Sequence, residues 1–480
     1  MACHRKSAAW MRRCTLAWAW AWACAGVAGG ALAATMDLAQ AWEAAVANDP
    51  QLRAARATAD ANRERVPQAQ AQLRPQVNLS MQRGRNELVS ESPNFLGQLE
   101  RQHQYYGSGT DTLTVRQPIY RPQLAAQLRQ AQALAASGDA ELEEEQQRLV
   151  MRLTQAYLGT LQAEEQVRLV AIQRSAYEVQ LDAARKGFAA GSGIRTDIDE
   201  AQARLDLNAA QDLEARQAVD FARRQLFVII GQRVSELAGL DAARLPLVVP
   251  EPPRLDDWLA RAEAASPEIR TAAANVEAAR QEVERVRAAH HPTLDGIAQV
   301  SRSQSDNPTR IDNRYRHQSI GVQLNVPLYQ GGLVQSQIRQ ALADLERYES
   351  VLEGLRLDLA ARVHREFRGV TEGIARVRAL EQAVRSSEQL VTSSRRSQQG
   401  GSRTLVDVLN AEQQLGIARR DLSQARFGYL LSVVRLRALA GERAEASIAD
   451  VNRWLVGSAS GDRPPLSDGP PPRSSSAASH

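Results

Sequence analysis

The sequence predicts a mainly α-helical protein with a smaller β-part, built from very long helices and organised as two tandem copies of one structural repeat. Three features predict this fold class: an apolar seam along one very long helix, matched landmarks in the two halves, and short stretches of alternating polarity in each half. The composition agrees, because the 480 residues are rich in Ala, Gln, Arg, Glu and Leu and only 5% of them are aromatic.

The longest predicted helix covers residues 335–396. Apolar and aromatic residues recur from Ile338 to Val384 in 13 steps over 46 residues, a mean spacing of about 3.5, which is typical of helices that pack in coiled coils. No proline interrupts this stretch. Its 62 residues, at about 1.5 Å each, extend over roughly 90 Å, so the helix needs other long helices beside it.

The first 33 residues have the pattern of a secretory signal peptide. A basic start is followed by an uncharged run rich in Ala and Trp over residues 14–27 and by Ala31-Leu32-Ala33, a small-x-small cleavage sequence. We therefore expect residues 1–33 to be cleaved off. A single membrane anchor is the alternative, which the shortness of the run disfavours, and lipidation of Cys24 is another.

All three cysteines lie in this leader, so we expect no disulfide and no Cys-ligated metal in the mature chain. Beyond residue 33 no apolar run approaches the roughly 18 residues that a transmembrane helix requires. An exported chain of this kind is periplasmic, secreted, or part of an outer-membrane β-barrel.

Landmarks of the two halves match at nearly constant offsets, which indicates an internal duplication. The offsets are 217, 209 and 210 residues, and the matched landmarks are Asn48-Asp49-Pro50-Gln51-Leu52 with Ala265-Ser266-Pro267-Glu268-Ile269, Pro118-Ile119-Tyr120 with Pro327-Leu328-Tyr329, and Gly191, Asp197 and Gly231 with Gly401, Asp407 and Gly441. We therefore expect a first repeat over residues 34–243, a Pro-rich linker over 244–257, a second repeat over 258–443 and a disordered C-terminal tail over 444–480.

Each half is predicted to contain the same elements in the same order. Opening helices lead into two stretches of alternating polarity, which predict one β-hairpin per half, and a long helix, a Gly-rich turn and a shorter returning helix follow. In the first half we expect opening helices over 36–48 and 50–73, a polar segment between the strands over 84–109, a long helix over 123–188 and a returning helix over 196–230. In the second half the same elements are expected over 255–265 and 267–290, 301–314, 335–396 and 404–440.

The predicted strands carry one apolar face, as in the alternation of Ile320, Val322 and Leu324 with polar neighbours. Such a sheet needs a cover, which is either a layer of helices or membrane lipid. A lipid-facing sheet must close into a barrel, and four strands cannot close alone, so the second alternative requires several chains to share one barrel. The tyrosines near the strand ends fit an aromatic girdle: Tyr105, Tyr106, Tyr120, Tyr315 and Tyr329.

One motif resembles a known family. The stretch Gly401-Ser402-Arg403-Thr404-Leu405-Val406-Asp407-Val408-Leu409-Asn410-Ala411-Glu412 is similar to the G-T-R-T-[IL]-[VL]-D-V-L-[DN]-A motif of the TolC family of outer-membrane channel-tunnels, and it looks closest to the type I secretion branch. The resemblance covers nearly the whole mature chain. It implies a homotrimer whose chains share a 12-stranded barrel in the outer-membrane lipid and a periplasmic tunnel of helices, docked to a periplasmic adaptor and to an inner-membrane ABC or proton-driven transporter.

The resemblance also implies roles for residues of the constriction. Asp407 would face the lumen at the periplasmic end, where three copies form a negative ring that favours cations. Asn410 stands at the next inward position, where well-known family members carry a second Asp. The plain alternative is that Asp407 lies three residues after Thr404 and completes a helix cap.

Further residues match family positions that hold neighbouring coiled coils shut. Arg403, Thr196 and Asp197 occupy such positions, and Gln398 stands where the family has a Tyr partner; the alternative is that Thr196 and Asp197 only cap a helix. The Gly-rich turns would be the tips that dock the adaptor, and the alternative is a turn that needs positive φ. The tip residues are Gly191, Ser192, Gly193, Gly400, Gly401, Ser402 and Thr404.

The sequence argues against catalysis. It contains no HExxH, P-loop or GxSxG motif, and its net charge of +4 gives no basis for nucleic-acid binding. We expect no enzyme, no cofactor and no metal site. The expected function is a passive outer-membrane duct for type I secretion of a polypeptide; the alternatives are a duct for drug efflux and a structural periplasmic coiled-coil protein.

Overall fold

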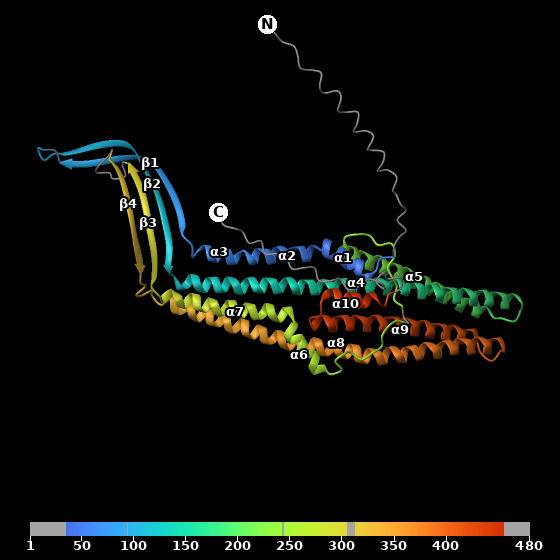
Figure 1. The fold of residues 1–480 in the computed structure, drawn as a ribbon. Helices are drawn as coiled ribbons and strands as arrows, with labels where there is room; N and C mark the ends of the chain where they lie inside the picture. Colours follow the sequence, from blue (N-terminus) through green and yellow to red (C-terminus); the bar gives the residue numbers. More distant parts are fainter. Residues whose placement is uncertain (1–34, 94, 242–243, 305–312, 456–480) are drawn as a thin grey trace, which may run out of the picture.

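The computed structural model describes residues 35–93, 95–241, 244–304 and 313–455. It is an elongated molecule with a β-sheet at one end and helices that run from this sheet to the other end (Figure 1). The helices are α1 (Leu38–Asn48), α2 (Pro50–Arg63), α3 (Arg65–Ala71), α4 (Pro122–Ala189), α5 (Arg195–Ile230), α6 (Leu255–Ala265), α7 (Pro267–Arg287), α8 (Leu333–Gln399), α9 (Leu405–Leu439) and α10 (Ala444–Asn452), and the strands are β1 (Gln76–Pro93), β2 (Leu99–Tyr120), β3 (Thr293–Gln304) and β4 (Arg314–Asn325).

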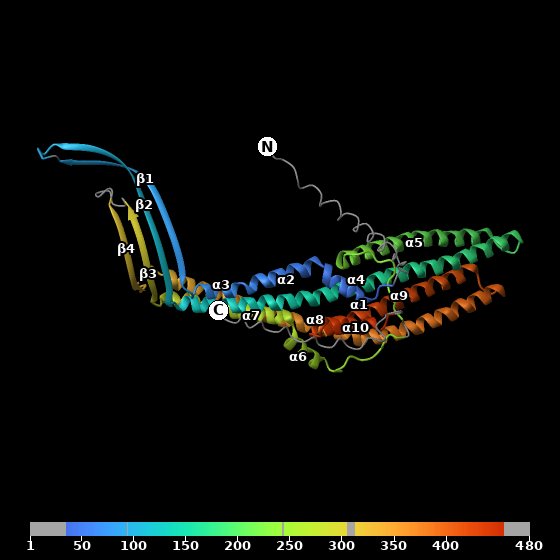
Figure 2. The ribbon, with the colours of Figure 1, turned by 45° about the horizontal axis from the view of Figure 1, so that its top comes forward.

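The predicted long helices are confirmed, and each has partners along its whole length. Helices α4 and α8 contain 68 and 67 residues. The returning helices α5 and α9 cover the half far from the sheet, and α2, α3 and α7 cover the half near it (Figure 2). Within the described residues, no helix combines the length and the apolar character that crossing a membrane requires.

The breaks between the opening helices have a local cause that recurs in both halves. Pro50 and Pro267 each occupy the first turn of a helix, where a missing N–H costs nothing. The residue before each proline caps the helix: Asp49 accepts a hydrogen bond from the Leu52 N–H at 2.7 Å, and Ser266 plays the same part for α7. These breaks let the chain bend as it runs along the long helix.

The four strands form one antiparallel sheet in the order β1-β2-β3-β4. Residues directly opposite one another in the register point to the same face. One face is apolar near the helices and carries Val77, Leu79, Leu113, Val115, Ala298, Val300, Ile320 and Val322, whereas the other carries Asn78, Ser80, Thr112, Thr114, Gln299 and Ser319. The apolar face has no protein cover within one chain, since Ile320 is 89% exposed.

The expected polar connection over residues 84–109 is wrong. Strand β1 continues to Pro93 and β2 begins at Leu99, so this hairpin is much longer than its alternating part. Its outer portion carries scattered apolar side chains such as Leu88 and Val89 on both faces and shows no alternation, although the backbone pairing continues without a break from Gly84 to Pro93. In the second half, the expected connection 301–314 also contains strand ends, and its residues 305–312 lie outside the described part.

The C-terminal boundary also needs correction, because residues 444–452 form α10 instead of belonging to a disordered tail. Ile448, Val451 and Leu455 are buried in the main hydrophobic core with residues of α1, α4 and α9. The buried Asn452 accepts a hydrogen bond from the Leu38 N–H at 3.0 Å and donates to Asp37 Oδ2 at 3.1 Å. Residues 456–480 of the expected tail, like the expected signal peptide, lie outside the described ranges.

The expected linker over residues 244–257 is present but ends earlier than predicted. Residues 245–254 contain neither helix nor strand, and α6 already begins at Leu255. The linker packs on the second repeat, where the Tyr429 hydroxyl donates to the Pro246 carbonyl oxygen at 2.5 Å. In the first repeat the fully buried Tyr157 hydroxyl lies 2.9 Å from the Met36 carbonyl oxygen and 3.0 Å from that of Ala238. Both tyrosines therefore fix irregular segments to long helices.

Candidate functional site

Two matched turns form the end of the molecule opposite the sheet (Figures 1 and 2). Gly191 and Gly401 have φ of +73° and +76°, a conformation that favours glycine, as expected. The hydroxyls of Ser192 and Ser402 each donate to the carbonyl oxygen five residues earlier, at 3.1 Å. The tip residues Gly191, Ser192, Gly193, Gly400, Gly401 and Ser402 therefore build two copies of one turn.

Asp407 belongs to the cap of α9. Its Oδ2 accepts hydrogen bonds from the Thr404 N–H at 2.9 Å and the Thr404 hydroxyl at 2.8 Å, while the Asp407 N–H donates to Thr404 Oγ1 at 3.3 Å. The hydrogen bonds from Thr404 lower the pKa of the Asp407 carboxyl. The carboxylate is exposed and keeps its second oxygen outside the cap. Capping α9 therefore leaves Asp407 free to take the role in the constriction that the family resemblance implies.

The first repeat lacks this cap, although its turn is the same. Ile194 stands where the second repeat has Thr404, and α5 has no side-chain cap. The expectation that Thr196 and Asp197 cap this helix is wrong, because both already lie in its first turn. Ile194 is 62% exposed, so the tip of the first repeat presents an apolar side chain where the second presents a polar cap.

Arg204 connects the two repeats near the tips, and sequence reasoning missed it. From α5 it donates through Nη2 to Asn410 Oδ1 at 3.1 Å and through Nη1 to Gln413 Oε1 at 2.5 Å, both on α9. Its Nε donates to Glu200 Oε1 at 3.1 Å in its own helix. Asn410, predicted as part of the constriction, is thus held by a cation of the other repeat. The amino-acid sequence contains one indication of this contact, namely that Asn410 stands where the family resemblance places a second Asp.

Arg403 has a different partner from the one that the family resemblance implies. Its Nη1 donates to the Ser394 hydroxyl at 2.6 Å, so within one chain Arg403 stabilises its own helical hairpin. The structure does not bring it to Thr196 or Asp197 of the same chain through any hydrogen bond between described residues. Gln398 lies at the end of α8 and accepts the Gly401 N–H at its backbone oxygen, at 2.9 Å.

A small apolar cluster lies directly behind the tips. Leu405 and Leu409 of α9 pack against Tyr177 and Leu181 of α4 and Ala201 of α5. This cluster and the Arg204 contacts join the two helical hairpins at this level. Three apolar side chains remain exposed around the turns: Phe188, Ile194 and Val406.

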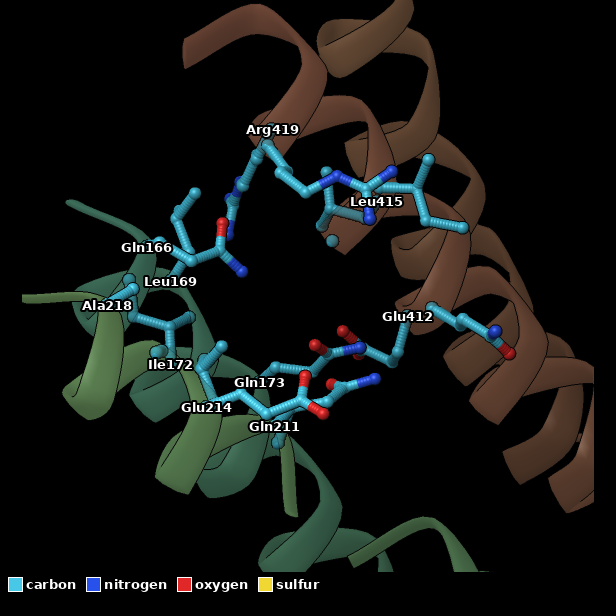
Figure 3. Close-up of a pocket in the computed structure, with 17 residues that line it drawn as sticks. Gln166, Leu169, Ile172, Gln173, Gln211, Glu214, Ala218, Glu412, Leu415 and Arg419 are labelled. Atoms are coloured by element: carbon cyan, nitrogen blue, oxygen red, sulfur yellow. The ribbon is translucent and has the colours of Figure 1, made fainter. Parts of the chain in front are cut away.

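Between this contact and the main core, the hairpins enclose a groove of about 470 Å³ lined by α4, α5 and α9. Figure 3 shows Gln166, Gln173 and Gln211 on one side and Glu412 and Arg419 on the other. Glu412 is paired with the guanidinium of Arg395 on α8, and Arg419 Nη2 donates to Glu388 Oε1 at 2.8 Å. Glu412 and Arg419 of α9 are thus bonded to α8, so the two hairpins meet across a polar space here.

Charged groups near the tips form contacts between helices. Among the described residues no cluster of His, Cys, Asp and Glu has the arrangement of a metal site. Glu412 is neutralised by Arg395, and burial raises the pKa of the Tyr177 hydroxyl, which keeps it protonated. The arrangement of caps, cross-helix hydrogen bonds and apolar contacts is suited to holding helices together.

Comparison with known proteins gives matches over most of the chain. The family model "Outer membrane efflux protein" matches residues 41–232 and 258–442. The proteases secretion protein PrtF of Dickeya chrysanthemi is 32% identical over 89% of this chain and 92% of its own length. The alkaline protease secretion protein AprF of Pseudomonas aeruginosa is also 32% identical, over 86% of each chain. The solved structure of the outer-membrane channel OprN has the same fold, with a TM-score of 0.74, 19% identity and coverage of 85% of this chain and 90% of that one.

Replacing Arg204 tests the contact between the hairpins. Arg204→Ala removes two cross-helix hydrogen bonds, each worth about 0.5–1.5 kcal/mol, so we expect roughly tenfold more time in a state with separated hairpins. Single-channel recordings in planar bilayers should show higher conductance. Arg185→Ala is the matched control, because Arg185 bonds only to Gln202 within its own hairpin. Equal conductance of the two variants would contradict the assignment of Arg204.

The cap predicts a pH dependence for Asp407. A lowered pKa means that the carboxylate keeps its charge, and the cap its stabilising effect, until the pH falls below the usual Asp value of about 3.9. Block of the pore by multivalent cations should therefore persist to that pH and be absent in Asp407→Ala. Thr404→Val should move the loss of block to higher pH, because it removes the hydroxyl donor. Ser402→Ala, which removes a hydroxyl of the same tip that does not contact Asp407, should leave the profile unchanged.

Proposed function

The chain belongs to the outer membrane efflux protein family, the TolC-like outer-membrane channels with long periplasmic helices, and from this premise we propose that it is the duct of a type I secretion system for a polypeptide. Proteins of this family are transport ducts and catalyse no reaction, so the polar groups at the tips serve conduction and assembly. The observation that supports a polypeptide cargo is the 32% identity, over 86% or more of the chain, to two proteins named for protease secretion.

Channels of this family act as trimers together with inner-membrane transporters and adaptors. For this chain, three copies would pool their strands in a 12-stranded barrel, with β1 of one copy beside β4 of the next. The support is that both strands are edges of the sheet and that the apolar face has no cover within one chain. Closure removes the open edges and leaves only side chains in contact with lipid.

At the periplasmic end, three copies of Asp407 would form the cation-selective ring of the constriction. Its exposure and its free carboxylate oxygen support this role. The next level would carry Asn410 with Arg204 beside it, so its charge would be reversed relative to a second Asp ring. Arg403, Thr196, Asp197 and Gln398 would act between neighbouring coiled coils of different chains.

The two turns would be the docking surface for the adaptor. Gly400 offers a test without backbone strain, because its φ is −83° and a Cβ there would meet only ordinary contacts at 3.7 Å. Gly400→Trp should abolish export and leave the amount of trimer in the outer membrane unchanged, as measured in culture supernatant and membrane fractions. Ser92→Trp, an exposed position at the opposite end of the molecule, is the control and should preserve export.

Deletion of the gene in its own host tests the function as a whole. We expect one or a few polypeptides to disappear from the culture supernatant, as detected by mass spectrometry, with unchanged inhibitory concentrations of dyes and detergents. Expression of the intact chain from a plasmid should restore the missing polypeptides. The reverse result, an unchanged supernatant and increased sensitivity to dyes, would contradict secretion and favour efflux as the function of the channel.

A further inference from the structure

The apolar face of the sheet ends in a cluster of arginines. In the antiparallel register, Leu79, Leu113 and Val300 lie opposite one another on this face. Two residues farther from the helices, the opposed residues are Met81, Asp111, Arg302 and Arg316, and the next level contains Arg83, Gly109, Gln304 and Arg314. Arg83, Arg302, Arg314 and Arg316, here called the arginine cluster, therefore point to the same side of the sheet as the apolar residues.

The arginine cluster lies at the border of the apolar band. Exposed apolar residues run from Ile320 to Leu328, which corresponds to about 27 Å along an extended chain, or about 21 Å in height at the roughly 40° tilt of barrel strands. The lipid-facing band of an outer-membrane barrel is roughly 25 Å tall. Arg316 and Arg314 follow four and six residues beyond Ile320, away from the helices. Because the helices extend into the periplasm, the arginine cluster lies at the level of the outer leaflet headgroups.

The cluster surrounds a hollow of about 580 Å³. Gly84, Gly107 and Gly109 form part of its wall. A Cβ added at Gly107 would meet only the Gly84 carbonyl oxygen, at 3.9 Å, so the space beside Gly107 is open. The side chain of Arg83 crosses Gly109, where an added Cβ would lie 3.1 Å from Arg83 Cδ. Gly109 thus makes room for the Arg83 side chain, and Gly107 leaves space beside it that the guanidinium groups can reach.

The charge of the cluster is not balanced by neighbouring carboxylates of the described sheet. Arg83 is paired with Asp111 through Nη1 and Nη2, at 2.7 and 3.0 Å. Arg302, Arg314 and Arg316 form no ion pair with a carboxylate of any described residue, and all three are exposed. Among the described residues, four guanidinium groups therefore lie together with one carboxylate.

We propose that the arginine cluster binds the phosphate groups of a phosphorylated glycolipid of the outer leaflet, whose acyl chains cover the adjoining apolar face. Guanidinium groups present parallel N–H donors that match phosphate oxygens. Basic pockets beside a membrane span recognise anionic headgroups on the same basis. The sheet thereby offers one continuous surface, with apolar rows for the acyl chains and the arginine cluster for the phosphates. The proposal rests on the outer-membrane orientation that accompanies the proposed function.

Native mass spectrometry of the purified full chain in detergent tests the proposal, with bis-phosphorylated lipid A as the probe. We expect Arg302→Gln with Arg316→Gln to weaken lipid A binding by at least about tenfold. The matched control is Arg365→Gln with Arg376→Gln, two exposed arginines of α8 that lose the same charge, and its binding should equal that of the unaltered chain. Dephosphorylated lipid A should bind the unaltered chain as weakly as intact lipid A binds the double variant.

Three results would overturn the proposal. Equal binding by the double variant and the control would remove the arginine cluster from lipid recognition. Full displacement of lipid A by millimolar inorganic phosphate or pyrophosphate would make it a site for free anions. Dissociation of the double variant into single chains would make the cluster a contact between copies of the chain.

Bilayer recordings distinguish a failure of this proposal from a failure of the proposed function. Both double variants should conduct like the unaltered chain, because the arginine cluster lies outside the lumen. If the unaltered chain forms no channel, the proposed function fails, whatever the lipid result. If it conducts and lipid A binding is independent of Arg302 and Arg316, only the inference about lipid fails.

Discussion

The uncovered apolar face of the four-stranded sheet is the constraint on which the rest of the structure depends. Within one chain this face has no protein cover, and the two outer strands keep unpaired backbone groups along one edge. Neither condition is tolerated in water or in lipid unless the sheet closes on other copies and its apolar side meets acyl chains. Association of copies and insertion into the membrane therefore act together: they remove the open strand edges and cover the apolar face. They also fix the direction in which the long helices leave the membrane.

The junction of sheet and helices is held by two ion pairs to one buried carboxylate. Asp295 on β3 is 2% exposed and accepts hydrogen bonds from Arg116 on β2 and Arg121, the residue before α4, each at 2.6 Å. A buried carboxylate is tolerated only with such partners, so its position fixes the angle at which the helix continues the strand. The register shift between Pro118 and Tyr120 lies at the same place and turns β2 toward α4. The helical rod is thus attached to the sheet through a defined corner.

Duplication gave the two repeats the same turn, and divergence gave the tips different side-chain contacts. Both turns share the glycine with positive φ and the serine bonded five residues back. Only the second repeat has the Thr404–Asp407 cap, and only the first supplies Arg204 to Asn410. The exposed carboxylate of Asp407 and the cation of Arg204 therefore come from opposite hairpins, so their spacing depends on how the hairpins pack. The electrostatic environment of Asn410 in the second repeat is therefore set in part by Arg204 of the first repeat.

The long helices, the four strands and the glycine turns follow from the amino-acid sequence alone, because a seam without proline, an alternation of polarity and a positive φ are properties of one short segment. Tertiary structure alone decided that residues 444–452 form a helix, since Ile448 and Val451 gain their burial from α1 and α9. It also decided the partner of Asn410, which lies 206 residues from Arg204. Local patterns specify the state of one element, whereas contacts between distant elements depend on packing geometry that no single segment encodes.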